Sequence, residues 1–516
     1  MLTGDMLRRS AARFPNKPAI IDDDREISYR DLDRDANRLA NALIAAGIRK
    51  GEKVAILSRN RLEYGVAFFG VARSGAILVN VSILYAEEEL RYVLHRSDCV
   101  AVLYESPFGG KLESVLPELR DIRLTIALDN QLGPIPQALS FKDLLGSVTD
   151  EEPEMGLRDS DPFCMTYTGG TTGRPKGVLA SHRNRDITAH TVMHEEQLDE
   201  RDVIGIVTPM FHVAALNIMF QPAILAGATT TLLRKWDVDD FIEMVERTGM
   251  TAAFMVPTQI AMVVQHKGLR AESLQKSWRT VSFAGAPMPD WVQREMTQKL
   301  PAVSLVQIYG QSEIGVVTAL RPWDLERKLG SIGRQAYNVD LAVVDPQGKP
   351  VAVGEVGEVV SWGDNVMLEY YNEPDQTREF FKHQNGIGWT GDLATMDEEG
   401  FITLVDRSKD MIISGGENIY PKEIENVLYE HPAVAECAVF GIPDAKWGEI
   451  PAAYICLKPD QRVTVEELDA HCASRLARFK RPRLIEFVDG FPKTPIGKIQ
   501  KNLLRDPFWQ EREKKI

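Results

Sequence analysis

Residues 165–178 read Met165-Thr-Tyr-Thr-Gly-Gly-Thr-Thr-Gly-Arg-Pro-Lys-Gly-Val178, a glycine- and threonine-rich run with an apolar residue at each end. Glycines let the backbone approach an anion closely and point N–H groups at it, the threonines add hydroxyl donors, and Lys176 adds a full charge. This run predicts a loop that cradles phosphate. It differs from the P-loop of nucleoside triphosphatases, because Lys176 lies between Pro175 and Gly177 and not before a Ser or Thr that opens a helix. On its own, a Gly/Thr cluster is more often a surface loop.

The composition is that of a globular protein. The 516 residues are 44% hydrophobic and 26% charged, which excludes collagen, coiled coil and bulk disorder and assures a sizeable core. The length predicts two or three domains. Lys and Arg total 60 against 74 Asp and Glu, and the net charge of −14 has the wrong sign for general attraction to nucleic acid or anionic lipid. We therefore expect no nucleic-acid partner, and any polyanionic ligand must be held by local basic groups.

Cysteine usage and the N-terminal sequence bear on localisation. The five cysteines are scattered without a C-x-x-C pair, so we expect them to be reduced and structural. The N-terminus places arginines inside a helix-like pattern, which differs from an export signal. The most apolar region, residues 66–84, is broken by Arg73, Ser74 and Asn80, whereas a membrane span needs about 20 mostly apolar residues. These features predict a cytoplasmic protein without a membrane span.

Helical and strand signals alternate through the first part of the chain. Residues 31–48 are amphipathic, residues 53–57 form a short strand, and residues 63–73 are helical again. The alternation recurs with a helix over 238–248 and a strand over 252–256. Such alternation predicts an α/β fold whose large N-terminal domain has parallel sheets flanked by helices.

Two later segments differ in composition. Residues 341–360 alternate as β-strands do around a Pro-Gln-Gly turn, which predicts a β-rich subdomain. After residue 406 a charged stretch precedes a separate pattern of helices and strands. Because no apolar periodicity crosses that stretch, we predict an N-terminal domain over 1–405, a hinge over 406–409 and a small α+β C-terminal domain over 410–516.

Further motifs follow the glycine- and threonine-rich run. They are Ala284-Gly-Ala-Pro287, Tyr309-Gly-Gln-Ser-Glu313, Gly388-Trp-Thr-Gly-Asp392, Asp406-Arg-Ser-Lys-Asp410, Gly415-Gly-Glu-Asn418 and Pro495-Ile-Gly-Lys498. In this order, and over nearly the whole chain, they closely resemble the landmarks of the adenylate-forming superfamily, which includes acyl- and aryl-CoA ligases, peptide-synthetase adenylation domains and luciferases. The resemblance implies carboxylate activation, in which R–COO⁻ attacks the α-phosphorus of ATP to give acyl-AMP and pyrophosphate.

The resemblance assigns each motif a part of the nucleotide. The residues that would hold the β- and γ-phosphates are Thr168, Gly169, Gly170, Thr171, Thr172, Gly173 and Lys176. The residues that would bind the adenine and its surroundings are Gly285, Ala286, Pro287, Tyr309, Gly310 and Gln311. Ser312 would touch the α-phosphate, and Glu313 would ligate Mg²⁺, a hard cation that takes carboxylate and water oxygens. Asp392 would accept the ribose hydroxyls, and Arg407 would reach the ribose or a phosphate.

Lys498 is the expected catalytic lysine. It lies on a loop because Pro495 and Gly497 disfavour helix, and by resemblance it would neutralise the charge shared by the carboxylate and the α-phosphate. Lys409 stands at the pivot of the superfamily hinge, about which the mobile C-terminal domain would turn between adenylation and thioester formation. Because the loop of Lys498 would be exposed when that domain turns away, a lysine acetyltransferase is a further expected partner.

The second substrate is expected to be CoA. By resemblance, the residues beside the pantetheine thiol are Gly415, Gly416 and Glu417. The residues that would stack on the CoA adenine and bind its phosphates are Trp447, Phe479, Lys480 and Arg481. A tryptophan plug or a solvated basic patch would explain the same residues without a ligand, so this assignment depends on the resemblance.

The acyl group would enter a largely apolar pocket. Peptide-synthetase domains usually carry an acidic residue where this chain has Phe211-His212, which argues against amino-acid substrates, and His212 is expected to gate the acyl tunnel. A lone His is more often a core residue. By their places beside the landmarks, the lining residues are Phe211, His212, Val213, Ala214, Leu216, Asn217, Gly285, Gln307, Gly310 and Val316. This lining predicts a medium-chain aliphatic or an aromatic acid.

The chain is thus interpreted as an AMP-forming carboxylic acid–CoA ligase that uses ATP, Mg²⁺ and CoA, with Lys498, Glu313, Lys176 and His212 as its catalytic residues. Two alternatives remain open at this point. One is an adenylating enzyme that loads a carrier protein, and the other is a non-catalytic nucleotide-binding relative. A homodimer is also compatible with the resemblance.

Overall fold

The computed structural model describes residues 1–135, 137–168, 175–286, 288–382, 386–407, 410–415, 417–493 and 499–509. The predicted site residues that lie outside the described residues are Gly169, Gly170, Thr171, Thr172, Gly173, Pro287, Lys409, Gly416 and Lys498. The chain forms two compact units. Unit 1 comprises Met1–Gly170, Arg174–Leu341 and Ser361–Gly388, and unit 2 comprises Thr171–Gly173, Ala342–Val360 and Trp389–Ile516.

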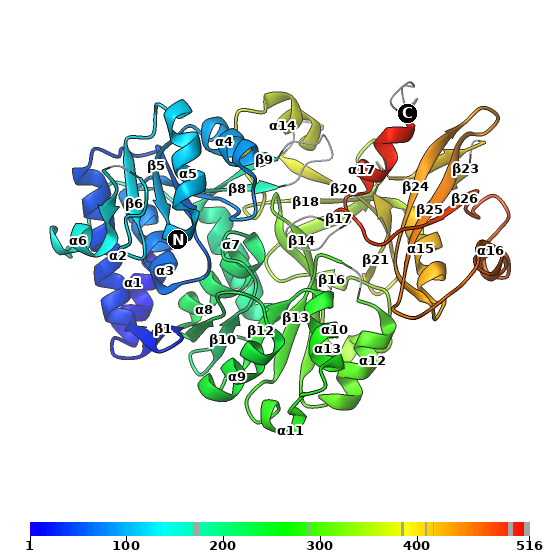
Figure 1. Ribbon diagram of the computed structural model, residues 1–516, viewed down its shortest axis with the longest axis horizontal. Coiled ribbons are helices and arrows are strands. Elements are labelled where there is room, and N and C mark those ends of the chain that lie inside the picture. The colour runs from blue at the N-terminus through cyan, green and yellow to red at the C-terminus, as the bar shows by residue number, and fades with distance from the viewer. Residues whose placement is uncertain are drawn as a thin grey trace. The chain divides into compact units, whose positions relative to one another are not determined.

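Unit 1 contains a nine-stranded sheet, counted over the described residues (Figure 1). In spatial order its strands are β16 (Arg334–Gln335), β15 (Gly315–Leu320), β14 (Ser304–Gln311), β13 (Thr280–Phe283), β12 (Ala252–Met255), β10 (Val203–Ile206), β11 (Thr229–Leu232), β1 (Pro18–Asp22) and β2 (Arg25–Ser28). The strands from β14 to β1 pair in parallel, whereas β15, β16 and β2 add antiparallel edges. The carboxyl ends of β12, β13 and β14 therefore meet at one edge of the sheet.

Unit 1 also contains a second sheet, eight-stranded within the part of the chain that is described. Its strands in spatial order are β19 (Glu369–Tyr370), β9 (Lys176–Ser181), β8 (Pro162–Thr168), β4 (Ile77–Asn80), β3 (Lys53–Leu57), β5 (Cys99–Tyr104), β6 (Leu124–Ala127) and β7 (Leu139–Ser140). Only β8–β9 and β9–β19 pair antiparallel. The predicted strand over 53–57 and the expected parallel α/β architecture are confirmed.

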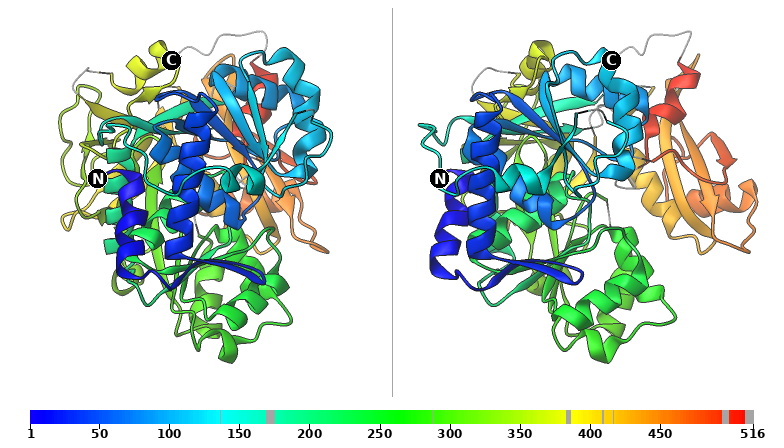
Figure 2. Two further views of the ribbon diagram at one scale, coloured as in Figure 1. Left: turned by 90° about the vertical axis from the view of Figure 1, so that its left-hand side faces the viewer. Right: turned by 60° about the vertical axis from the view of Figure 1, so that its left-hand side comes forward.

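Helices cover both sheets of unit 1. They are α1 (Thr3–Arg13), α2 (Tyr29–Ala45), α3 (Leu62–Ser74), α4 (Glu87–Arg96), α5 (Gly109–Val115), α6 (Phe141–Gly146), α7 (His182–Glu195), α8 (Gln221–Ala226), α9 (Val238–Thr248), α10 (Pro257–Gln265), α11 (Ala271–Leu274), α12 (Asp290–Lys299), α13 (Pro322–Leu325) and α14 (Pro374–Phe380). A π-helix, η3 (Ala214–Phe220), runs directly into α8, and short 3-10 turns, η1 (Ser106–Phe108) and η2 (Leu116–Glu118), flank α5. Figure 2 shows α1 and α2 side by side.

The largest core of unit 1 lies between the two sheets and encloses α3. Every residue of α3 except Leu62 is buried. Phe68 packs edge-on against Phe163 of β8, with ring centroids 5.1 Å apart. On the other side, a Cβ at Gly65 would lie 2.5 Å from Cδ1 of Ile20 in β1, so glycine lets the helix approach the nine-stranded sheet. Apolar contact with both sheets explains why α3 is hydrophobic all round.

Unit 2 is built on two sheets. The first consists of β17 (Asp340–Val344), β18 (Gly357–Trp362), β20 (Ile387–Met396) and β21 (Ile402–Arg407). The predicted β-rich segment over 341–360 supplies its first two strands. The second sheet consists of β23 (Glu417–Ile419), β22 (Ile412–Ser414), β25 (Gly448–Leu457) and β24 (Val434–Asp444), and β26 (Leu484–Phe487) pairs with β25 in parallel. Among the neighbouring strands of the two sheets, β20–β21, β22–β23, β22–β25 and β24–β25 pair antiparallel.

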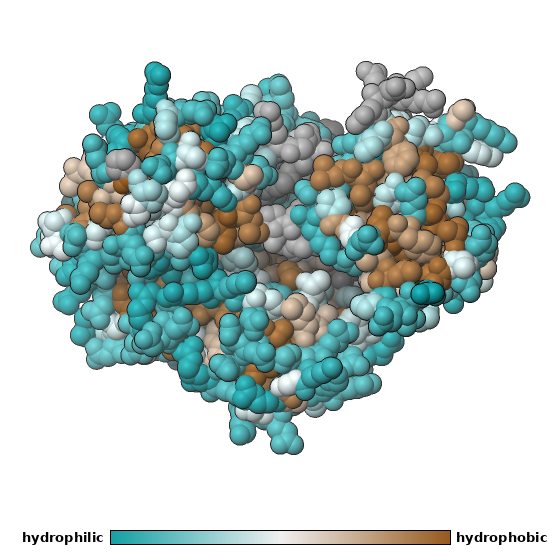
Figure 3. Space-filling model, in the orientation of Figure 1, coloured by the Kyte–Doolittle hydropathy of each residue, from teal (hydrophilic) through white to brown (hydrophobic). Residues whose placement is uncertain are grey.

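The second sheet of unit 2 carries helices on its faces. They are α15 (Pro421–Tyr429), α16 (Val465–Ala473), α17 (Lys501–Arg505) and the 3-10 turn η4 (Asp506–Phe508). Ile424 of α15 and Leu468 of α16 belong to one buried cluster with the sheet. Figure 3 shows apolar side chains over β24, β25 and β26, where Leu484 and Leu504 pack around Phe440. Among the described helices, none combines the length and the hydropathy that a membrane span requires.

Candidate active site

The two ends of the glycine- and threonine-rich loop are held by neighbouring strands of unit 1. Thr168 ends β8 and Lys176 begins β9, and the two residues are paired Cα partners in the antiparallel ladder. Gly177 follows Lys176, and a Cβ there would lie 2.8 Å from Sδ of Met165. Residues 169–174, which come between them in the sequence, lie outside the described part of the chain. Their predicted phosphate contacts therefore stay a prediction, but the anchoring strands fix where the loop starts and ends.

Tyr370 joins Lys176 to Glu313. Its hydroxyl donates a 2.7 Å hydrogen bond to Oε1 of Glu313, and Nζ of Lys176 lies 5.0 Å from the centre of its ring. Strand β19, which carries Tyr370, pairs with β9, whereas Glu313 follows β14 of the other sheet. The backbone of Met367 also donates a 2.7 Å hydrogen bond to the carbonyl oxygen of Glu313. A cation and a carboxylate from two sheets are thus brought to one ring beside the loop.

Tyr370 was not among the residues predicted for the site. The residue stands in Leu368-Glu-Tyr-Tyr371, which contains no motif with an obvious chemical task. The two adjacent tyrosines could have drawn attention to this segment as a source of functional side chains. Nothing in their spacing indicates that one of them would reach Glu313, which is 57 residues away. Long-range contacts of this kind follow from sheet pairing.

Glu313 lies in the tight turn between β14 and β15. A Cβ at Gly310 would lie 1.9 Å from the carbonyl oxygen of Gly315, so only glycine fits this β-bulge. Gly315 has a φ of +65°, a backbone conformation that favours glycine. Asn365 donates a 2.8 Å hydrogen bond from Nδ2 to the carbonyl oxygen of Ile314, which ties down the turn. Glycine is therefore required on both sides of the Gln311-Ser-Glu313 segment, because a side chain would clash with the backbone at Gly310 and would strain the backbone at Gly315.

The predicted adenine residues gather at the carboxyl edge of the nine-stranded sheet. Phe283 of β13 pairs with Gln307 of β14, so Tyr309 and Gly285 both lie just beyond that pair. Gly285 has a φ of +85° and is exposed, as is Ala286. Tyr309 is 9% exposed, and Pro287 lies outside the described residues. Ligands of open α/β sheets bind at such carboxyl edges.

The predicted acyl-pocket residues start at the turn before η3 and continue along this π-helix. His212 is partly exposed, and burial lowers the pKa of its ring to about 4, so the ring is neutral at pH 7. Its Nδ1 accepts a 3.2 Å hydrogen bond from the backbone N–H of Ala214. The lining residues that are buried are Phe211, Ala214, Leu216, Asn217 and Val316. Gln307 and Val213 are partly exposed. Short π-helical segments often occur at functional sites.

In unit 2, the predicted ribose carboxylate already has a partner. Nε of Arg407 lies 3.1 Å from Oδ1 of Asp392, and the two residues are Cα partners in the β20–β21 ladder. Asp392 is 6% exposed. The neighbouring Asp406 accepts hydrogen bonds from the backbone N–H groups of Arg407 and Lys422, and burial raises the pKa of its carboxyl to about 6.

Part of the predicted CoA region comes together around Trp447. Gly415 has a φ of +60°, donates a 2.8 Å hydrogen bond to the carbonyl oxygen of Trp447, and would bring a Cβ within 2.7 Å of the indole ring. Lys446 lies 4.6 Å above that ring, which remains 45% exposed. Glu417 is exposed in β23. An exposed aromatic plate with a cation beside it is suited to stacking on a nucleotide base.

The other predicted CoA residues lie elsewhere in unit 2. Phe479 is 40% exposed and has Lys480 5.8 Å from its ring centre. Nζ of Lys480 forms a 2.7 Å ion pair with Glu423, so its charge is partly neutralised within the unit. Arg481 is largely buried at its Nε atom, which forms no hydrogen bond within the described chain.

Mg²⁺ would require oxygens beyond the protein. The described residues contain no group of three or more His, Cys, Asp or Glu side chains that could hold a metal ion. Glu313 offers a single carboxylate, which fits a cation that takes most of its ligands from nucleotide phosphates and water.

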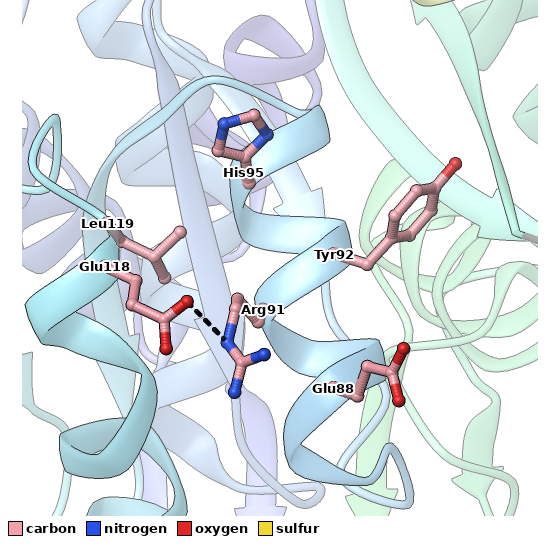
Figure 4. Close-up of a pocket in the computed structure, with 6 residues that line it drawn as sticks. All are labelled: Glu88, Arg91, Tyr92, His95, Glu118 and Leu119. Atoms are coloured by element: carbon pink, nitrogen blue, oxygen red, sulfur yellow. Dashed lines mark ion pairs between the residues drawn. The ribbon is translucent and has the colours of Figure 1, made fainter.

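A shallow hollow on unit 1 lies apart from these residues (Figure 4). It is lined by Glu88, Arg91, Tyr92, His95, Glu118 and Leu119. Arg91 and Glu118 form a 3.3 Å ion pair across it. None of the predicted site residues lines this hollow.

Comparison with known proteins identifies relatives along the whole chain. The profile of the AMP-binding enzyme family matches residues 7–371, and that of the AMP-binding enzyme C-terminal domain matches residues 423–498. Feruloyl-CoA synthase from Amycolatopsis sp is 36% identical over 506 residues, which cover 97% of this chain and 98% of that protein. The long-chain-fatty-acid–CoA ligase FadD13 from Mycobacterium tuberculosis is 34% identical over 508 residues, 98% of each chain.

A solved structure of similar fold contains an adenylate. The anthranilate CoA ligase AuaEII in complex with anthranoyl-AMP superimposes with a TM-score of 0.89 at 29% identity, over 98% of this chain and 97% of that one. The similarity extends over both units, including the C-terminal region.

Proposed function

The chain belongs to the AMP-binding enzyme family and is an AMP-forming acid–thiol ligase that uses ATP and CoA, and on this premise we propose that its acid substrate is aromatic or a medium-chain fatty acid. The first reaction joins a carboxylate oxygen to the α-phosphorus of ATP and releases pyrophosphate. In the second, the CoA sulfur attacks the acyl carbonyl carbon, the thiol gives up its proton, and AMP leaves.

The arrangement of Lys176, Tyr370 and Glu313 carries this proposal. Two anions have to meet in the first reaction, and unit charges about 4 Å apart repel by roughly 4 kcal/mol at an effective dielectric near 20. Lys176 would offset the charge of the β- and γ-phosphates that the adjoining loop holds. Glu313, oriented by the Tyr370 hydroxyl, would ligate the Mg²⁺ ion, which when bound neutralises phosphate charge.

The remaining nucleotide contacts are proposed from the edge of the nine-stranded sheet and from unit 2. Tyr309 would stack on the adenine and Ser312 would reach the α-phosphate. Asp392 would accept the ribose hydroxyls, with Arg407 holding its carboxylate through the 3.1 Å contact. Lys498 would neutralise the charge that develops between the carboxylate and the α-phosphate, and a turn about 406–409 would expose the thioester-forming face.

The substrate proposal depends on η3. The buried residues Phe211, Ala214 and Leu216 leave an apolar surface beside a neutral His212. An apolar lining with a few convergent polar groups is typical of a pocket for a small organic acid. The named relatives that act on ferulate and on long-chain fatty acids bracket the proposed range.

The test is a panel of acids from acetate through octanoate to benzoate and cinnamates. Pyrophosphate release that requires both ATP and an acid, followed by thioester formation with free CoA, is the expected result. Pyrophosphate release without thioester formation would identify an enzyme that loads a carrier protein instead. If no acid in the panel released pyrophosphate, the proposed substrate range would be wrong.

A further inference from the structure

Several buried polar side chains in unit 1 have atoms without a hydrogen-bond partner among the described residues, and three of these side chains adjoin the proposed acyl pocket. Asn217 is 1% exposed, and neither its Nδ2 nor its Oδ1 forms a hydrogen bond. Ser282 is 0% exposed and Glu196 is 3% exposed, and neither side chain has a well-formed hydrogen bond, although the Ser282 hydroxyl lies close enough to Glu196 to stabilise its charged form. Leaving such a group unsatisfied destabilises the fold, and native proteins avoid it. Three of them together need an explanation.

The three side chains belong to one layer. Ser282 pairs with Phe254 and with Val306, so it points to the same face of the nine-stranded sheet as these two core residues. Strands β10 and β12 carry η3, the element of Asn217, on that face. Glu196 follows the carboxyl end of α7, which packs against η3, and it lies next to Ser282.

This layer adjoins the proposed acyl pocket. Asn217 is itself one of the predicted lining residues. Ser282 lies on β13, which ends at Phe283, and it precedes Gly285 by three residues, which span at most about 10 Å. Gly285 lies at the edge where the reacting carboxylate would be, so Ser282 lies deeper by a distance that a hydroxycinnamate spans. An acid that enters from the edge would present its far end to these groups.

Burial keeps the Glu196 carboxyl protonated. It raises the pKa of Glu196 to about 8, so this side chain is mostly neutral at pH 7 and offers both a donor and an acceptor. Asn217 likewise offers both, and Ser282 adds a hydroxyl. Neutral groups of this kind match a neutral hydroxyl better than a charged tail.

We propose that Asn217, Ser282 and Glu196 form a polar end of the acyl pocket that selects acids carrying a hydroxyl group far from the carboxylate. The inference rests on the proposed function and narrows its substrate class. Hydrocarbon acids of equal size would offer these polar groups no hydrogen-bond partner, which a site built for a hydroxyl strongly disfavours. Ordered water could also occupy the layer, and in that case the enzyme would not distinguish the two kinds of acid.

The experiment compares 4-hydroxycinnamate with 4-methylcinnamate, which has a similar size but lacks the hydroxyl. We expect kcat/KM of the full-length enzyme for ATP-dependent thioester formation to be at least ~10-fold higher for the hydroxy acid. Ser282→Ala and Asn217→Leu should each reduce this ratio several-fold. Glu196→Gln should keep the ratio because it retains a donor and an acceptor, whereas Glu196→Met should reduce it.

Thr231 supplies a matched control. Its Oγ1 is also fully buried and unpartnered within the described chain. Thr231 pairs with Gly205, and Gly205 pairs in turn with Ala253. Ala253 pairs with Val281, the neighbour of Ser282, so Thr231 lies on the opposite face of the sheet. Thr231→Val should therefore leave the ratio unchanged.

The outcomes separate the inference from the proposed function. Equal kcat/KM for the two acids, or a ratio that falls as much in Thr231→Val as in Ser282→Ala, would overturn the inference while the ligase activity stands. If neither acid releases pyrophosphate, the inference fails, and the proposed function fails with it only if no other acid of the panel releases pyrophosphate. Thermal unfolding of each variant shows whether it folds. If Asn217→Leu does not fold, the ratio measured with Ser282→Ala, the smallest change, decides whether the inference stands.

Discussion

Glu313 in unit 1 and Asp392 in unit 2 are both assigned to the nucleotide, but their surroundings differ. Glu313 accepts a hydrogen bond from the neutral Tyr370 hydroxyl, whereas Asp392 is buried against the Arg407 guanidinium. A carboxylate oriented by a phenol keeps its charge for a cation. A carboxylate that is paired with a guanidinium has much of its charge offset and is better suited to accept hydroxyl hydrogen bonds. The comparison therefore supports Glu313 as the proposed metal ligand and Asp392 as the proposed acceptor of the ribose hydroxyls.

The largest effect is expected for a residue of unit 2 other than Asp392. Lys498→Ala should slow acid-dependent pyrophosphate release by ~10²-fold to 10³-fold, because one charge-stabilising donor contributes about 3–4 kcal/mol in the transition state. Single-turnover release of radiolabelled pyrophosphate measures it. Lys493→Ala is the control, since Lys493 forms a 2.6 Å ion pair with Glu436 and has no assigned role. A loss below tenfold in Lys498→Ala would contradict the assignment.

The next prediction tests the unit 1 side of the comparison. Tyr370→Phe should lower kcat/KM for ATP by ~10-fold to 100-fold, because a hydrogen bond to a charged group contributes about 1.5–3 kcal/mol. It should also raise the Mg²⁺ concentration needed for half-maximal rate, measured by metal titration. The matched variant is Tyr371→Phe, whose hydroxyl contacts Lys53 and Asp98. Equal effects of the two substitutions would show that Tyr370 has only a structural role.

A smaller effect is expected for the guanidinium in unit 2. Arg407→Ala should raise KM for ATP by no more than ~5-fold with kcat little changed, because a partly exposed ion pair contributes about 0.2–1 kcal/mol. Initial-rate kinetics with varied ATP separates the two parameters. A large fall in kcat would show that Arg407 contacts the reacting phosphate and does more than hold Asp392.

The smallest expected effects are opposite pH dependences of stability. In the fold, burial lowers the pKa of His212 from 6.5 to about 4, so between these values only the unfolded chain binds this proton and stability rises with pH. Burial raises the pKa of Asp406 from 3.8 to about 6, so in that range the fold retains a proton that the unfolded chain has lost and stability falls with pH.

Thermal unfolding of two variants tests the predicted direction in which each group changes the stability with pH. Relative to the unmodified protein, His212→Phe should gain more stability at pH 5 than at pH 7. Asp406→Asn should gain more at pH 7 than at pH 4. A reversed order for either variant would mean that the group ionises differently from what its burial implies.

The candidate site residues could be named from the sequence because their motifs are local in the chain. In the turn of Tyr309 to Glu313, Gly310 and Gly315 are needed for a close approach or a positive φ, and the same holds for Gly415 beside Trp447. Elements with clear periodicity were also predicted well, such as α9 and β3. The hairpin of β24 and β25 extends further than its apolar runs indicate, because ladder pairing continues to Asp444 and Gly448.

Other features could not be predicted. Tyr370 reaches Glu313 only because β19 joins the edge of the eight-stranded sheet. Glu195 and Glu196 are adjacent acids at the end of α7, yet Glu195 pairs with Arg321 while Glu196 is buried beside Ser282. No periodicity in the sequence distinguishes the ion-paired Glu195 from the buried Glu196.

The amino-acid sequence alone determined the reaction type, since the order of its glycine-rich motifs and charged residues specifies which groups a nucleotide would meet. Only the tertiary structure decided which side chains meet across the two sheets, which carboxylate is neutralised and which polar groups are left buried and unpartnered. The physical reason is that motif chemistry is carried by neighbouring residues. Burial, pKa shifts and hydrogen-bond satisfaction depend on segments that packing brings together from distant parts of the chain.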